Sequence, residues 1–471
     1  MKLIYKSLIV FAVALSGCDK TIDVDIPMGK FTNAAVYGTD DLAQAGMKGV
    51  YATMTNAFST CPFEGALSTT LCLSADEMVR ASANSTDQQQ LADNNLLPSN
   101  GTVVNLWAVF YNYVYQANMV YENVENSPGV TLPIKDRLMG EARFIRALSL
   151  FYLTNLYGNI PLTLTSDYQK NAVLHVSSQQ EVYAQIVQDL KYAQSKLGAG
   201  NTAVSYRYRP NKWAATALLA RVYLYTKDWA NAEKEAGDVI AQNGIYKLDA
   251  LENVFNLSST EAIWALANAG SNIYTGEGGA VTGSNATNSQ TRLTPYFLSQ
   301  FSSDDQRLLK WTRASVGVTP VNTAPSKYKT FSNTQAGAKV EASMVLRLAE
   351  QYLIRAEARA MQNNITGAID DVDMVRKRAG AVGDASKNFQ TIRFSNPGIQ
   401  KADMIEAIYT ERMTELFSEY GHRWFDAKRS GKTLANFFGT RKTDISETDA
   451  FFPIPEKEIA YNPNIKQNDG Y

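Results

Sequence analysis

Histidine is scarce in this 471-residue sequence, with only His175 and His422 present. This scarcity disfavours a histidine-based metal site and a Ser-His-Asp catalytic triad. Net charge is also nearly absent, since 45 Lys and Arg residues balance 46 Asp and Glu residues to a formal charge of −1. No basic face is therefore expected, and nucleic acid is not an expected partner.

Cysteine is almost as rare, with three residues at Cys18, Cys61 and Cys72. Outside the cytoplasm a cysteine pair can oxidise. A disulfide between Cys61 and Cys72 and a pair of buried thiols are both compatible with the sequence.

Long apolar runs are missing as well. Residues 8–15 (LIVFAVAL) are too few to span a bilayer, which takes about 20 apolar residues, and they follow the basic Lys2 and Lys6. This pattern is typical of a secretory signal. It ends in residues 15–18 (LSGC), which resemble the bacterial lipobox. The resemblance implies cleavage of residues 1–17, a diacylglycerol on the Cys18 thiol and usually an acyl group such as palmitate on its amine. Two or more chains anchor a protein stably; the alternative is a plain secretory signal with an incidental cysteine.

What the sequence does contain is helical periodicity with many aromatic side chains. We expect one helix to begin after Thr39, because Asp40 and Asp41 suit its first turn. Long helices are expected over residues 103–124 and from residue 140 to Gly158. Another should begin with a capping box formed by Ser178 and Glu181.

Two later segments, residues 217–240 and 352–375, both have the pattern of helix, short turn and helix. The same number of residues separates Ala220 from Ala232 and Ala356 from Ala368, so small side chains recur where paired helices pack closely. This is a degenerate form of the tetratricopeptide pattern. Two unrelated helical hairpins are the alternative interpretation.

The region between these hairpins, about residues 245–340, has a different character. Residues 261–269 (EAIWALANA) predict a strand, and residues 270–291 are rich in Gly, Ser, Thr and Asn. The glycines do not match a phosphate-binding loop. A long insertion of this kind usually carries function or disorder.

Five blocks of the sequence together resemble the SusD/RagB-like outer-membrane lipoproteins of Bacteroidetes-type bacteria. They are residues 106–118 (LWAVFYNYVYQAN), 140–162 (GEARFIRALSLFYLTNLYGNIPL), 347–358 (RLAEQYLIRAEA), 411–431 (ERMTELFSEYGHRWFDAKRSG) and 452–471 (FPIPEKEIAYNPNIKQNDGY). Asp469 departs from the family pattern, in which proline is common before the final Gly-Tyr, and His422 is at another variable position.

The resemblance implies a mainly α fold, in which a tetratricopeptide-like helical superhelix carries a loop-rich, minor-β ligand-binding part. It also implies one domain over residues 18–471. The family's N-terminal half covers about 18–240, the loop insertion about 245–340 and the C-terminal half about 341–471.

The function implied by the resemblance is nutrient capture at the cell exterior. Such proteins are lipid-anchored in the outer membrane and deliver ligands, most often oligosaccharides or polysaccharides, to a SusC/RagA-like TonB-dependent transporter. They are not enzymes, and neither a cofactor nor a metal is expected. The RagB branch makes peptides an alternative cargo.

Two rival functions are compatible with single features of the sequence. A glycoside hydrolase needs only two carboxylates, but no spacing or motif singles out a pair. The carboxylates of the resembling blocks lie beside arginines and are interpreted as scaffold ion pairs: Glu141, Glu357, Glu411 and Asp426 beside Arg143, Arg355, Arg412 and Arg423. The second rival is a purely structural tetratricopeptide adaptor that binds another protein.

Candidate ligand contacts come from two irregular stretches, by positional likeness to the family. A sugar site needs an exposed aromatic plane together with amide or carboxylate groups. Residues 74–84 offer Asp76, Glu77, Arg80 and Asn84, and residues 270–331 offer Tyr274, Trp311 and Tyr328. Alternatively, Trp311 and the two tyrosines pack loops together. Trp107 is assigned to the core.

Overall fold

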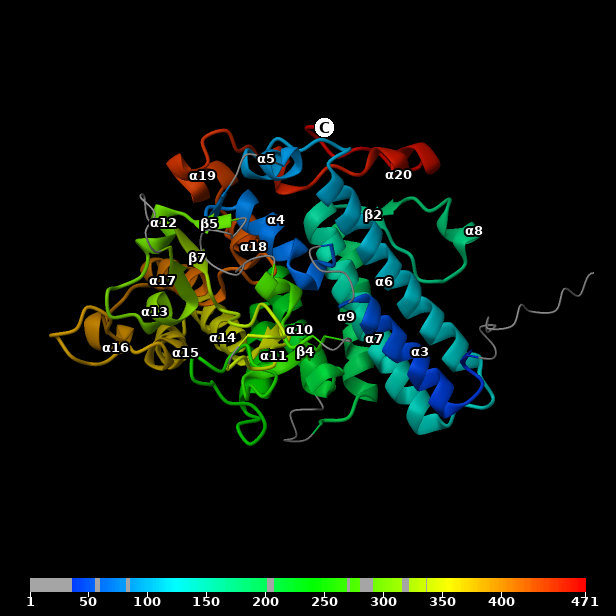
Figure 1. Ribbon diagram of the computed structural model, residues 1–471, viewed down its shortest axis with the longest axis horizontal. Coiled ribbons are helices and arrows are strands. Elements are labelled where there is room, and N and C mark those ends of the chain that lie inside the picture. Colours follow the sequence, from blue (N-terminus) through cyan, green and yellow to red (C-terminus); the bar gives the residue numbers. More distant parts are fainter. Residues whose placement is uncertain are drawn as a thin grey trace, which may run out of the picture.

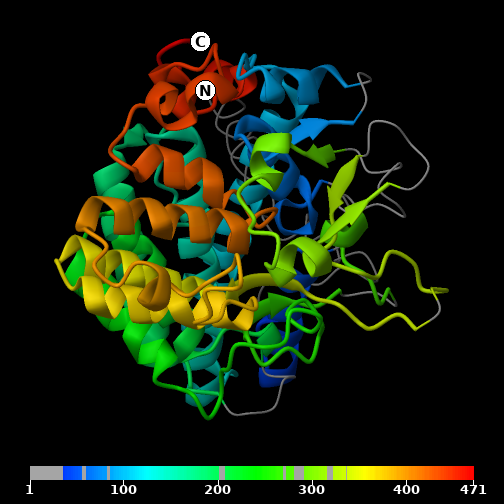
Figure 2. The same cartoon turned by 90° about the vertical axis from the view of Figure 1, so that its left-hand side faces the viewer.

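The computed structural model describes residues 36–55, 60–81, 85–200, 207–268, 272–279, 291–315, 322–335 and 337–471. Long helices form one side of the molecule, and most of the short strands and the loops lie on the other side (Figure 2). Cys18 and the predicted signal segment, residues 1–17, lie outside the described residues.

The N-terminal part is a group of long helices, seen at the right of Figure 1: α3 (Asp40–Thr53), α6 (Gly101–Asn126), α7 (Leu132–Tyr157) and α9 (Gln179–Lys196). Helix α7 packs against both α6 and α9. Its residues from Leu138 to Tyr157 are all buried except Arg143, as expected for a helix that is apolar nearly all round. Gly158, with φ of +76°, ends it.

Two of the predicted helix starts are confirmed, whereas α6 begins at Gly101 instead of residue 103 and α7 begins at Leu132 instead of residue 140. The Thr39 side chain accepts a hydrogen bond from the backbone N–H of Leu42, and Asp40 and Asp41 occupy the first turn of α3. The capping box of Ser178 and Glu181 begins α9. These caps satisfy backbone donors that a helix leaves open at its start.

The two predicted helical hairpins are α10 (Lys212–Tyr225) with α11 (Trp229–Ile240), and α14 (Leu348–Met361) with α15 (Ile365–Arg378). Helix α11 packs against α14, and α17 (Lys401–Leu416) packs against α14 and α15, so that the hairpins continue the helical layer. Their four matching alanines are completely buried: Ala220, Ala232, Ala356 and Ala368.

The turns of the two hairpins are also equivalent. Each holds a non-glycine residue with positive φ, Lys227 at 61° and Asn363 at 67°, and these follow the first alanine of each hairpin at the same offset. Repetition of both the small residues and the turn conformation confirms the tetratricopeptide-like interpretation.

The remaining elements are short and connect or cover this scaffold. They are η1 (Pro62–Glu64), α4 (Ala66–Ser74), β1 (Met78–Arg80), α5 (Thr86–Ala92), β2 (Ile160–Pro161), α8 (Tyr168–Asn171), β3 (Val176–Ser177), β4 (Ala262–Leu266), β5 (Thr291–Leu293), α12 (Pro295–Leu298), α13 (Gln306–Trp311), β6 (Thr312–Ala314), β7 (Thr323–Pro325), β8 (Ser343–Arg347), α16 (Ile392–Ser395), α18 (His422–Arg429), α19 (Leu434–Phe438), η4 (Gly439–Arg441), η5 (Glu447–Ala450) and α20 (Glu456–Tyr461).

The described strands form antiparallel pairs, β1 with β5, β2 with β3, β4 with β8 and β6 with β7. The strand predicted over residues 261–269 is β4, and every residue of β4 and β8 is buried. This central pair joins the insertion to the start of α14 and so fixes the loop-rich side to the helical side.

The two cysteines of the described chain are buried and are not joined to each other by a disulfide. The thiol of Cys61 donates to the backbone carbonyl of Thr53, with an Sγ–O distance of 3.4 Å, while Cys72 lies inside α4. Of the two alternatives left open by the sequence, the structure has the buried thiols.

None of the described helices is both long enough and apolar enough to cross a membrane.

Candidate ligand-binding groove

The two irregular stretches predicted to supply ligand contacts do meet in the structure. Strand β1 pairs antiparallel with β5, which places Val79 opposite Arg292. Thr294 strengthens the junction, because its backbone N–H donates to the carbonyl of Glu77 and its hydroxyl donates to the carbonyl of Asp76. Asn84 lies outside the described residues, and Tyr274 is half-buried.

Most of the predicted polar contacts in the first stretch are structural groups. Asp76 is buried, and its carboxylate oxygens receive Arg423 and Arg441 at distances of 2.8 Å. Burial opposes ionisation of Asp76, but these guanidinium groups outweigh it and lower the pKa of the carboxyl. Glu77 is also buried, and burial raises its pKa to about 8 against the lowering effect of a hydrogen bond with Cys72. Arg80 is half-buried and donates to the carbonyl of Ser85.

Trp311 is not an exposed platform, which corrects the expectation for the second stretch. Its exposed fraction is 0%, and its indole N–H donates to the carbonyl of Leu251 over 2.9 Å. Its ring meets Phe255 edge to face at 5.7 Å, and Tyr328 is also buried, with its ring 4.9 Å from that of Phe255. Both aromatic residues therefore pack the insertion onto the body, which is the alternative that the sequence left open.

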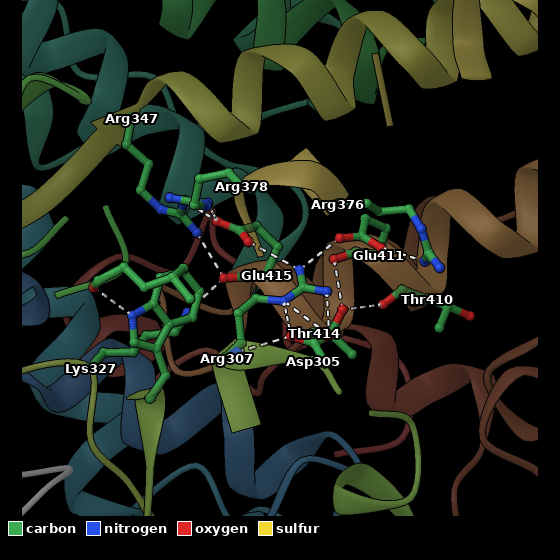
Figure 3. Close-up of polar contacts among 12 residues, drawn as sticks. Asp305, Arg307, Lys327, Arg347, Arg376, Arg378, Thr410, Glu411, Thr414 and Glu415 are labelled. Atoms are coloured by element: carbon green, nitrogen blue, oxygen red, sulfur yellow. Dashed lines mark hydrogen bonds and ion pairs between the residues drawn. The ribbon is translucent and has the colours of Figure 1, made fainter. Parts of the chain in front are cut away.

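A buried network of ion pairs holds this packed insertion in place (Figure 3). Arg307 of α13 contacts Glu411 at 2.6 Å and Glu415 at 3.1 Å, both on α17. Arg347 at the end of β8 contacts Glu415 at 2.6 Å. Lys327, which follows β7, pairs with Glu419 and also donates to the carbonyl of Glu415.

The positive charges around Glu415 lower the pKa of its carboxyl despite the opposing effect of burial. The network therefore stays ionised and joins α13, β8 and α17 into one rigid unit. Such a unit can support a binding surface, but its groups are enclosed and do not face solvent.

The carboxylates of the resembling blocks are paired with arginines, as expected for scaffold groups. Glu141 contacts Arg209 at 2.7 Å, and Asp426 contacts Arg412 at 2.7 Å. The other carboxylates predicted to be scaffold groups are Glu357, which pairs with Arg429, and Glu411, which pairs with Arg307 and Arg376. The block arginines Arg143, Arg355 and Arg423 pair with carboxylates outside the blocks: Asp189, Asp371 and Asp76. Within the described ranges, no group of three or more His, Cys, Asp or Glu side chains is placed to hold a metal ion.

A groove of about 410 Å³ lies elsewhere, between α6, the segment from β2 to α8, and α20. In Figure 1 these elements lie together at the upper right. Aromatic side chains line much of the groove: Trp107, Tyr111, Tyr115, Tyr168 and Tyr461. We call it the aromatic groove.

Helix α6 supplies one wall of the aromatic groove. Trp107, Tyr111 and Tyr115 follow one another at intervals of one helical turn, so they lie on the same face. Trp107 is 3% exposed, which confirms its assignment to the core, and it forms the deepest aromatic part of the wall with its ring 4.8 Å from that of Tyr111. Tyr115, farther along the helix, is 46% exposed.

The opposite wall carries the most exposed rings. Tyr168 on α8 is 75% exposed and Tyr461 on α20 is 81% exposed. Large exposed aromatic surface is costly in water, and where it gathers around a hollow it usually marks a place of recognition. These rings offer flat apolar faces with polar tips.

Hydrogen bonds hold the walls of the groove in position. The Tyr111 hydroxyl donates to the carbonyl of Pro161 over 2.8 Å, and the Asn118 amide donates to the carbonyls of Thr163 and Thr165. From α20, the Asn462 amide donates to the carbonyl of Leu174 over 2.8 Å. Hydrogen bonds from α6 on one side and α20 on the other therefore fix the backbone of residues 161–174, so the groove is formed before any ligand arrives.

Sequence reasoning misses this site although it places part of it correctly in a helix. Tyr115 and Tyr461 belong to blocks that resemble the family, but nothing in those blocks marks either tyrosine as a ligand contact. Tyr168 lies in a short polar stretch without a motif. One signal is available: a tyrosine in a polar segment such as residues 166–171 (SDYQKN) has no apolar neighbours to pack with and is therefore expected at the surface.

The fold and the groove define a class: a helical-repeat protein with a preformed aromatic surface for binding. Comparison with known proteins places the chain within that class. Residues 48–224 match a family described as "Starch-binding associating with outer membrane", and residues 310–471 match the SusD family.

Two relatives match over most of the chain, one of them over nearly its full length. SusD-like protein P38 of Formosa agariphila is 22% identical, over 97% of this chain and 96% of that protein. SusD-like protein P25 of the same organism is 26% identical, over 78% of this chain and 79% of that protein.

Solved structures share the fold. A SusD superfamily protein from Bacteroides vulgatus has a TM-score of 0.76 at 22% identity, covering 92% of this chain and 100% of that one. Another B. vulgatus protein, described as a proposed sugar binding protein, has a TM-score of 0.71 at 22% identity, covering 93% and 99%. The chain belongs to the SusD family.

Proposed function

We propose that this protein is a cell-surface binding lipoprotein that captures an oligosaccharide or polysaccharide and delivers it to a TonB-dependent outer-membrane transporter. The observation that carries the proposal is the aromatic groove, in which Tyr115, Tyr168 and Tyr461 present exposed rings around a preformed hollow. Sugar rings have C–H faces that stack on aromatic planes and hydroxyls that need polar partners.

The family supports the same proposal. One matching family is described by starch binding and association with the outer membrane, and a fold neighbour is described as a proposed sugar binding protein. We assign Cys18 as the lipid anchor of a single domain over residues 18–471, and we propose binding without catalysis. Capture of peptides remains the second candidate, since peptide side chains also stack on tyrosine.

The proposal is tested by screening the purified protein against polysaccharides, oligosaccharides and peptides, followed by titration of the groove variants. Replacing Tyr461 or Tyr168 by alanine removes an exposed ring that packs little of the core. We expect either change to weaken binding of the selected glycan about tenfold or more, which corresponds to ~1.4 kcal/mol, without lowering the melting temperature.

Phe394→Ala is the matched control, because this aromatic residue on α16 is 45% exposed and lies outside the groove. Its removal should leave the affinity unchanged. Selection of peptides in the screen would favour the second candidate. Unchanged glycan affinity in both tyrosine variants would refute the groove as the binding site.

A further inference from the structure

Among the described residues that line the aromatic groove, only Glu458 carries a charge. It lies on α20 three residues before Tyr461, so the two side chains share a face of that helix. Across the groove the Glu458 charge acts on Tyr111, whose pKa is raised well above its usual value, first by burial and then by this charge.

The carboxylate of Glu458 has no partner of its own within the part of the chain that the structure describes, because it forms no hydrogen bond or ion pair there. Its oxygens can accept several hydrogen bonds. By contrast, Lys170 on the facing α8 is already paired with Asp167 at 3.3 Å and does not line the groove. The hollow therefore holds a negative charge that no lining cation balances.

An unpaired carboxylate beside flat aromatic rings has a definite chemical preference. Sugar hydroxyls are donors, and hydrogen bonds from hydroxyls to a carboxylate are short and strong. A ligand carboxylate or sulfate is an acceptor only, so it would leave both anions without donors and would bring like charges together beside low-dielectric walls, where the repulsion is larger than in water.

We infer that the aromatic groove selects uncharged sugar rings and rejects anionic ones such as uronates and sulfated sugars, and that Glu458 sets this selectivity. The inference rests on the proposed function, since it specifies the ligand class of the same groove. It assigns Glu458 two roles, as acceptor for ligand hydroxyls and as a charge filter.

The test uses a matched pair of ligands, the uncharged oligosaccharide that binds best in the screen (maltoheptaose as the first probe) and the same compound with its primary alcohols oxidised to carboxylates. The wild-type protein should bind the uncharged form at least about tenfold more tightly. Added salt should reduce the difference, because salt screens repulsion between partly exposed charges.

Glu458→Gln keeps the size of the side chain and removes its charge. We expect this variant to bind the oxidised ligand several-fold more tightly than the wild type does, so that the preference shrinks to about threefold or less. Glu456→Gln is the matched control, because Glu456 lies on the same short helix but is exposed and does not line the groove. It should keep the wild-type preference.

The outcomes separate this inference from the proposed function. An unchanged preference in Glu458→Gln, or equal binding of both ligands by the wild type, would overturn the charge filter even if Tyr461→Ala still weakened glycan binding. Failure of every uncharged glycan in the screen would overturn the proposed function, and the selectivity inference with it.

Discussion

Glu64 is a buried acid beneath the insertion. It accepts hydrogen bonds from the Ser343 hydroxyl at 3.1 Å and from the backbone N–H of Gly276. Burial raises its pKa from 4.5 to about 7, against the lowering effect of these donors. Gly276 is required for this contact, since a Cβ there would lie 2.6 Å from Glu64 atoms.

This pKa shift predicts how stability depends on pH. The folded state holds the proton more tightly than the unfolded state, so the contribution of Glu64 is complete below pH 4.5 and is lost as the pH rises through about 7. Relative to Glu64→Gln, whose amide cannot ionise, the wild type should lose on the order of 2–3 kcal/mol of unfolding free energy between pH 5 and 8.

Urea unfolding at several pH values measures this difference. Glu406→Gln serves as a control, because Glu406 is exposed and pairs with Lys432 at the surface; its curve should run parallel to the wild type. Parallel curves for Glu64→Gln as well would show that Glu64 does not take up a proton on folding.

Individual residues are the hardest feature to predict from the sequence. Trp311 stands in a polar insertion, and nothing nearby along the chain shows that Phe255 and Lys327 will enclose it. Tyr461 is exposed beside Tyr168, which lies almost 300 residues away along the chain. Whether an aromatic residue is a platform or a packing group depends on such distant neighbours, and the pattern around one residue does not contain them.

At the scale of elements, the sequence is more informative. Helix caps and apolar periodicity are local, so Thr39, Ser178 and Gly158 mark their boundaries correctly. The strand pairs β1–β5 and β6–β7 are not predictable in this way, because each has only three residues per strand and its register is set by the fold around it.

The paired helices predict a cost for enlarging their contact residues. Ala220 on α10 and Ala356 on α14 are completely buried, and these helices pack against each other and against α11. Replacing either alanine by leucine should lower the unfolding free energy by about 1–3 kcal/mol through overpacking, as measured by denaturant titration.

Ala230→Leu provides the comparison, because Ala230 lies on α11 but is exposed. Its stability should stay within about 0.5 kcal/mol of the wild type. If Ala220→Leu and Ala356→Leu also left the unfolding free energy unchanged, the close packing inferred for these hairpins would be refuted.

At the scale of the whole molecule, the order of the blocks along the chain is enough to predict the family and the fold class. Single blocks are short and weak, but their succession from residue 106 to residue 471 reflects one continuous helical scaffold. The location of the groove is not predictable in this way, because α6, α8 and α20 come from three separate regions and meet only after folding.

The proposed cellular role depends on how the whole protein is attached. Residues 15–18 (LSGC) resemble a lipobox, so we expect attachment to depend on the Cys18 thiol. Cys18→Ala should leave an unacylated chain that a carbonate wash removes from membranes, while Cys61→Ala, which alters a buried thiol of the folded body, should remain attached. Retention of Cys18→Ala after the wash would refute the anchor.

The proposed delivery of ligand predicts a transporter partner. From membranes extracted in mild detergent, the tagged wild type should co-purify with a large TonB-dependent transporter in near-equal amounts, because capture is useful only beside the pore that takes up the ligand. Recovery of the wild type as a monomer from several detergents would instead indicate a binding protein that works without a transporter.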